Sequence, residues 1–169
     1  MDHVVAMLES LEHSALAISI AESNWAFPTI ETIHVIALTL MFGTVLIMDL
    51  RLLGLASVKQ RYTALQRDVL PWTWWGFGGA VVSGCLMFIT QATEYYENEA
   101  FRTKLLLLVL AGINMLVFDL MIARGAANWD RESSVPWPGK VAALLSIALW
   151  ISIVFFGRRV GFTMLLGRD

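Results

Sequence analysis

The sequence predicts an all-α integral membrane protein, an antiparallel bundle of four transmembrane helices with an N-terminal amphipathic surface helix. Two observations carry this fold class. The 169 residues are 57% hydrophobic and 15% charged, whereas soluble domains are about 45–50% apolar and about 25% charged. The chain also holds four long apolar runs, and a spanning helix needs about 20 mostly apolar residues. A soluble domain of this size could not hide so much apolar surface from water.

Residues 2–22 are too polar to span a membrane and are predicted to form one amphipathic helix. Apolar residues recur there at spacings of four and three, from Val4 to Ile18, which makes a single apolar stripe. Asp2, Glu9, Glu12 and Glu22 make the segment acidic, and an acidic face binds anionic lipid poorly. We therefore expect the helix on the outer membrane surface, where it caps the bundle or meets a partner.

The four spans are predicted at residues 28–49, 69–92, 104–123 and 141–163 of a single membrane domain. The first run reaches spanning length only by including Glu31 and His34. The fourth is short before Arg158 and Arg159, whose charged groups are expected to snorkel to the boundary. The connections are short, which favours an up-and-down bundle.

Basic residues and tryptophans set the expected orientation. The first and third connections together hold seven Lys or Arg residues, and the opposite side holds five. Because basic loops stay in the cytoplasm, both termini are predicted outside the cytoplasm. Five tryptophans fall at the proposed cytoplasmic ends, where indoles favour the headgroup layer: Trp72, Trp74, Trp75, Trp129 and Trp137.

Composition excludes several functions. A net charge of -2 leaves no basic stripe for nucleic acid, so no nucleic-acid partner is expected. The single cysteine, Cys85, excludes an internal disulfide framework and thiolate metal clusters. No pairing of a nucleophile with a base is visible, so catalysis without a cofactor is not expected.

Ionisable residues inside a span are costly, and each is a functional hypothesis. Glu31 and His34 are three residues apart, which places both on one face of the first span, near its outer end. They form either a hydrogen-bonded pair that holds this helix to a neighbour or part of a ligand site. A diiron site would need Glu-x-x-His twice, and zinc or copper would need more His or Cys ligands. Haem b needs the fewest protein ligands, because one neutral imidazole can hold its iron.

Haem propionates favour arginine or lysine at the membrane edge. Four basic residues lie at the outer ends of the third and fourth spans, level with His34: Arg102, Lys104, Arg158 and Arg159. Together they predict a cofactor site in which His34 is the metal ligand and Glu31 tunes it. The simpler interpretation is that these basic residues anchor to lipid phosphates.

A second charged cluster lies at the cytoplasmic ends. Asp49 and Arg51 close the first span, and Asp119 and Arg124 close the third. An Asp49–Arg124 or Asp119–Arg51 ion pair would join the two helices, and this structural role is preferred to a proton relay. Asp49 is about 22 Å from His34 along a helix axis, so the two clusters lie at opposite membrane faces.

The second span carries Gly76, Ala80 and Gly84 at intervals of four. Small residues at this spacing let another group approach the backbone closely. That group is a neighbouring helix, a second protomer or a flat cofactor ring, and helix packing is the commonest use.

Four strings of sequence, in order, carry a family resemblance: WAFPTIETIHVIALTLMFGTVLIMDLRLLGL, LPWTWWGF, AFRTKLLLLVLAGINMLVF and LSIALWISIVFFGRRVGF. They resemble a bacterial family of uncharacterised four-helix inner-membrane proteins, classed as a domain of unknown function. The resemblance covers residues 20–163 and implies a fold but no activity. It also implies a location in the bacterial inner membrane, which with the predicted orientation places both termini in the periplasm. Such chains often carry histidine where Asp119 stands here. A looser similarity to small haem-b and copper-resistance-type membrane bundles concerns the fold alone.

Two functions stay open from the sequence. One is a haem-b-binding redox or electron-transfer module with its site near the outer face. The other is a structural or accessory subunit that contacts a second copy or a membrane-complex partner through its small-residue face and N-terminal helix. A transporter of a small solute or metal ion ranks third, because few polar residues lie between the two charged clusters.

Overall fold

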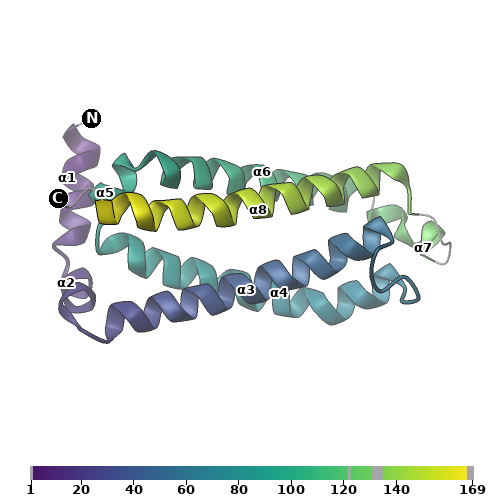
Figure 1. Cartoon of the computed structure of the whole chain (residues 1–169), viewed down its shortest axis with the longest axis horizontal. Coiled ribbons are helices and arrows are strands. Elements are labelled where there is room, and N and C mark those ends of the chain that lie inside the picture. The colour runs from purple at the N-terminus through teal and green to yellow at the C-terminus, as the bar shows by residue number, and fades with distance from the viewer. Residues whose placement is uncertain (1, 122, 131–134, 167–169) are drawn as a thin grey trace.

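The computed structural model describes residues 2–121, 123–130 and 135–166, and its regular elements there are all helical. Four long helices pack antiparallel in pairs (Figure 1): α3 (Ala26–Leu53), α4 (Tyr62–Ile89), α6 (Glu99–Met121) and α8 (Trp137–Leu166). Short helices lie at both ends of the bundle. The α5 end carries α1 (Asp2–Glu12), α2 (Ala15–Glu22) and α5 (Ala92–Glu97), and the α7 end carries η1 (Ala123–Gly125) and α7 (Ala126–Trp129). The predicted fold class is confirmed.

All four long helices are long and apolar enough to cross a membrane, so the chain is a multi-pass membrane protein. Their outer faces carry large exposed apolar side chains, as Leu116 and Val82 illustrate. These faces contact lipid. Helix α4 begins seven residues before the predicted span, because the polar turns around Arg67 and Asp68 continue the helix beyond its apolar part.

The N-terminal segment differs from its prediction, because residues 2–22 form two helices that meet at 58°. The helix is interrupted at Ser14, because the Ser14 hydroxyl accepts a hydrogen bond from the backbone N–H of Ala17 and so caps the start of α2. Together α1 and α2 are apolar enough to count as a broken fifth span. They run across the α5 end rather than along the bundle (Figure 1).

A carboxylate fastens this segment to the bundle. Glu12 Oε1 accepts hydrogen bonds from the backbone N–H of Thr93 at 2.7 Å and from its hydroxyl at 2.8 Å. Thr93 lies in the first turn of α5, where N–H groups lack partners within the helix and a negative charge is favoured. The N-terminal helices therefore cap the bundle.

The small residues of α4 pack against α3. A Cβ at Gly76 would lie 2.9 Å from both the carbonyl oxygen of Ala37 and the backbone nitrogen of Met41. Only glycine allows the two backbones to come this close. Helix α3 also packs against α8, and α8 against α6, so α3 and α8 join the two pairs. Figure 1 shows α3 and α8 diverging toward the α5 end.

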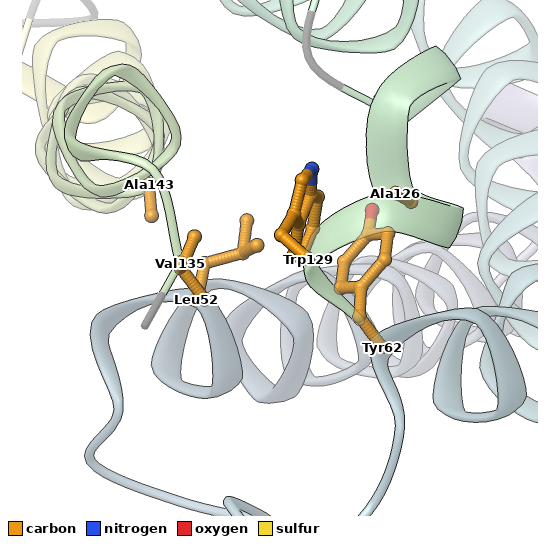
Figure 2. Packing of buried hydrophobic residues seen from close by; sticks show 6 residues of the cluster. All are labelled: Leu52, Tyr62, Ala126, Trp129, Val135 and Ala143. Atoms are coloured by element: carbon orange, nitrogen blue, oxygen red, sulfur yellow. The ribbon is translucent and has the colours of Figure 1, made fainter. Parts of the chain in front are cut away.

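At the α7 end, six buried residues form an apolar cluster (Figure 2): Leu52, Tyr62, Ala126, Trp129, Val135 and Ala143. The ring of Trp129 lies 5.4 Å from that of Tyr62 and is 8% exposed. The prediction of a headgroup-layer position is therefore wrong for Trp129, because its ring fills the core beneath α7. The other four tryptophans at this end are exposed.

Asp130 ties the chain after α7 to the start of α4. Its carboxylate accepts hydrogen bonds from the backbone N–H of Thr63, at 3.2 Å, and from the Thr63 hydroxyl. Burial acts to raise the pKa of Asp130, but the hydrogen bonds from Thr63 and Tyr62 and the charge of Arg61 outweigh it. The pKa of Asp130 is therefore lowered.

Candidate ligand site at His34

His34 lies on α3 toward the α5 end and faces α4. Its Nδ1 atom is 2.9 Å from the hydroxyl oxygen of Ser83. Ser83 in turn donates to the carbonyl oxygen of Gly79, at 2.5 Å, one turn earlier in α4. The edge of the imidazole ring rests on Gly84, where a Cβ would lie 3.1 Å from Cε1. Helix α4 thus fixes both the position and the orientation of the ring.

This network sets the tautomer of the neutral imidazole. A serine hydroxyl has one proton, and Ser83 gives it to a backbone carbonyl, so its oxygen must accept from Nδ1–H of His34. The lone pair then lies on Nε2, which has no hydrogen-bond partner among the described residues. A histidine that binds a metal through Nε2 has this arrangement, with the other ring nitrogen hydrogen-bonded.

Lys104 is the basic residue that lies nearest in level to His34. Its half-buried side chain runs from α6 toward α8, with Nζ 3.7 Å from the position of a Cβ at Gly157. It lies within electrostatic reach of the imidazole. Lys104 has no ion-pair or hydrogen-bond partner within the described part of the chain. An anion between the two helix pairs would therefore find an available positive charge.

The other predicted basic residues lie farther from the ring. Arg102 is exposed. Arg158 is exposed as well, and its guanidinium carbon stands 5.3 Å from the centre of the Phe162 ring. Arg159 lines a cavity of about 300 Å³ between the start of α6 and the end of α8, which Asn98 and Thr163 also line.

Glu31 is exposed and lies one turn before His34. Burial, followed by the charges of Glu31 and Glu94, raises the pKa of Tyr95 on α5. Glu31 therefore lies close to α5. The expected Glu31–His34 hydrogen bond is not among those of the described residues, and His34 bonds to Ser83 instead.

The second predicted cluster lies at the α7 end, and its members have separate surroundings. Arg51 is buried and donates from Nε to the carbonyl oxygen of Gln60, at 2.7 Å, which closes the α3–α4 loop. Asp119 is exposed, and no ion pair joins it to Arg51 among the described side chains. The expected Asp49–Arg124 pair lies outside the described residues, because the side chain of Arg124 is not among them.

Ser83 is the site residue that sequence reasoning missed. It is 49 positions from His34, and nothing local to either residue marks the contact. Its position beside the small-residue stripe of Ala80 and Gly84 was the available signal, because that stripe is the face of α4 that meets α3.

Comparison with known families adds to this geometry. Residues 23–163 match the family described as family of unknown function (DUF6644). The match begins directly after α2, so it includes the bundle and leaves the two capping helices outside. No curated protein and no solved structure gives a significant match to the chain. By the extent of the family match, which covers all four long helices, the chain belongs to this family of unknown function, DUF6644.

Proposed function

We propose that the chain binds haem b within the bundle, through the Nε2 atom of His34, and acts as a redox or electron-transfer module. The observation that carries the proposal is the hydrogen-bond chain from His34 through Ser83 to Gly79. It leaves a neutral imidazole with its Nε2 lone pair uncommitted inside a membrane bundle, and haem is the metal cofactor that needs the fewest further protein ligands.

The charges at this level fit the same cofactor. Haem carries two propionates, and Lys104, which has no ion-pair partner among the described residues, offers one of them a counter-charge. His34 and Lys104 come from different helix pairs, so a ligand that engages both would lie between α3–α4 and α6–α8. Arg102, Arg158 and Arg159 would serve a propionate only at the membrane edge. Glu31 would act on the site through its charge alone.

In this proposal each residue has one task. His34 holds the iron, Ser83 keeps the imidazole in one tautomer and one orientation, and Lys104 balances a propionate. Bound haem would supply one-electron chemistry.

An absorption spectrum tests the proposal. The protein is produced with a haem precursor, purified in detergent and scanned in the visible range. We expect a Soret band that His34→Ala removes and His13→Ala retains. His13 is the matched control, since it is exposed and its Nδ1 is bonded to the carbonyl oxygen of Glu9 at 2.7 Å. Absence of a Soret band under adequate haem supply, or a band that His34→Ala leaves unchanged, would overturn it.

A second variant isolates the role of Ser83. Loss of an outer hydrogen bond to a metal-binding histidine costs about 10–100-fold in affinity, so Ser83→Ala should weaken haem binding and shift the Soret maximum. Ser152→Ala is the control, because Ser152 also donates to the carbonyl one turn back, that of Ala148, but lies on α8 away from the ring. Equal haem affinity in both variants would remove Ser83 from the site.

The accessory-subunit function stays a prediction. The described residues contact lipid through their exposed apolar faces, and the small-residue face of α4 is already used against α3. A stable homo-oligomer or a co-purifying membrane partner in detergent would favour that function over the haem proposal.

A further inference from the structure

A second polar site lies inside the bundle at the α7 end, about 22 Å along the α3 axis from His34. A cavity of about 130 Å³ opens there among α3, α4, α6 and α8. Eleven of its seventeen lining residues are apolar or aromatic, and six are polar. An apolar protein cavity of about 150 Å³ holds benzene, so this one suits a compact molecule close to benzene in size.

Asp49 gives this cavity its charge. The Asp49 side chain lines the cavity and is 7% exposed, and its Oδ2 atom has no hydrogen-bond partner among the described residues. The buried hydroxyl of Ser146 hydrogen-bonds to this carboxylate, but Oδ2 stays without a partner among the described residues. A buried carboxylate oxygen without a partner is costly, and a cation placed in the cavity removes that cost. Asp119 lines the same cavity but is exposed, so a second acidic group lies on the outer side of the site.

The remaining lining favours an organic cation over a metal ion. Tyr62, Phe118 and Trp150 supply aromatic rings, which attract alkylammonium groups. A hard metal ion needs about six oxygen ligands. No group of three or more His, Cys, Asp or Glu that could hold a metal ion occurs in the described parts of the chain.

Two of the polar residues around the cavity already have partners. Asn114 donates to the carbonyl oxygen of Ala142 at 3.0 Å, and Thr73 donates to the hydroxyl of Thr44 at 2.9 Å. These bonds hold the cavity wall. The Asp49 carboxylate, with the Ser146 hydroxyl beside it, is the buried acidic group that a ligand can engage. We propose that this cavity binds a small alkylammonium ion, with Asp49 as its counter-ion. The site is separate from His34 and independent of haem.

The experiment uses two probes of matched shape, tert-butylammonium and neutral tert-butanol. Each is titrated into the detergent-purified full chain by isothermal calorimetry, with empty micelles as the blank. Hydrogen bonds to a charged group are stronger than neutral ones, so we expect tert-butylammonium to bind at least about tenfold more tightly than tert-butanol.

Variants then locate the charge. Asp49→Asn should lower tert-butylammonium affinity by about tenfold and leave tert-butanol unchanged. Asp68→Asn is the matched control, because Asp68 is an exposed acid on α4 near the same end and does not line the cavity. If Asp49→Asn fails to fold, the exposed Asp119→Asn still tests the site and should weaken the cation about two- to threefold, as expected for an exposed charge pair.

Three results would overturn the proposal. The first is equal binding of both probes, and the second is wild-type tert-butylammonium affinity in a folded Asp49→Asn variant. The third is binding that emerges only in Arg124→Gln, which would identify Arg124 as the resident counter-ion of Asp49. An unchanged affinity in Arg124→Gln, together with the tenfold loss in Asp49→Asn, supports it.

Discussion

Hydrogen bonds with α4 set the state of two ionisable residues in this protein. At His34, Ser83 fixes which ring nitrogen carries the proton. At Asp130, Thr63 lowers the pKa of the carboxyl group. In both cases a hydroxyl from α4 hydrogen-bonds to a residue far away in sequence. The protonation state of the ionisable group therefore depends on the position of α4.

Asp130 allows a prediction about stability. Asp130→Ala should lower the free energy of unfolding by about 1 kcal/mol at neutral pH, because the first turn of α4 loses an acceptor that acts as a cap. Thermal unfolding in detergent measures this difference. Asp68→Ala, which removes an exposed acid from the same helix, should change the stability by less than about 0.5 kcal/mol.

The same variant has a defined pH dependence. The pKa of Asp130 in the folded chain is below its ordinary value of 3.8. Its contribution to stability is therefore complete above the unfolded pKa and is lost as the pH falls through the lowered folded pKa. The difference between wild type and Asp130→Ala should stay constant at neutral and mildly acidic pH and shrink only below the ordinary pKa. A difference that persists unchanged in strong acid would contradict this assignment.

At the scale of helices, the closest backbone approach between α3 and α4 depends on the glycine at position 76. Gly76 and Gly78 are two residues apart, but only Gly76 faces another backbone, since a Cβ at Gly78 would have no neighbour within 4 Å. The rotation of α4 about its axis decides which of its glycines packs against α3 and which faces lipid. Hydropathy alone does not define that rotation.

Gly76→Ala and Gly78→Ala should therefore have opposite effects. A Cβ at Gly76 would force α3 and α4 apart, and overpacking of this kind costs about 1–3 kcal/mol. Gly78→Ala should leave stability unchanged or raise it by up to about 1 kcal/mol, because alanine favours the helix. Melting temperatures of the two variants in the same detergent test this, and equal effects would mean that α3 and α4 are not in the close register described.

The N-terminal helices make a separate unit that the Glu12 carboxylate fastens to α5, beside buried apolar side chains such as Leu8 and Ile20. Glu12→Ala should remove the two hydrogen bonds to Thr93 and free α1 from α5. Hydrogen–deuterium exchange should then speed up in residues 2–22 while the long helices keep their protection. Glu9→Ala is the control, since the Glu9 side chain is exposed. Unchanged exchange in Glu12→Ala would show that apolar contacts alone hold the segment.

Helix boundaries were harder to predict than helix positions. Hydropathy finds the apolar part of each span, so it placed the start of the second span at residue 69, although α4 begins at Tyr62. In residues 2–22 the apolar stripe continues past Ser14, so the pattern predicts one helix. The Ser14 hydroxyl caps α2 and divides the segment into two helices.

At the scale of the whole molecule, four antiparallel helices place both ends of the described chain at the α5 end (Figure 1). The sequence predicted this arrangement because each span carries its own apolar signal. It identified His34 as a polar residue inside the first span for the same reason. It did not identify Ser83 or the place of Lys104 beside Gly157, because those depend on how each helix is rotated and paired. Trp129 was misplaced because its type alone suggested the headgroup layer, whereas it packs under α7.

Reporter fusions test the predicted orientation. A reporter enzyme that is active only outside the cytoplasm should be active when fused after residue 169 and inactive when inserted at Ser57, in the loop between α3 and α4. This orientation is expected because the first and third connections hold more basic residues than the opposite side, and basic loops stay in the cytoplasm. The reverse pattern would invert the orientation but leave the bundle and its two proposed sites unchanged.

The close register of α3 and α4 has a consequence for how the protein is made. The first hairpin contains both backbones that meet at Gly76, together with His34 and its partner Ser83. All of these leave the ribosome before α6 does. We expect a nascent chain that ends after α4 to insert as a closed hairpin with its imidazole already oriented. The second hairpin then inserts and places Lys104 against a first hairpin that is already packed. The order of synthesis therefore means that the membrane does not contain an unpacked His34 and an unpacked Lys104 at the same time.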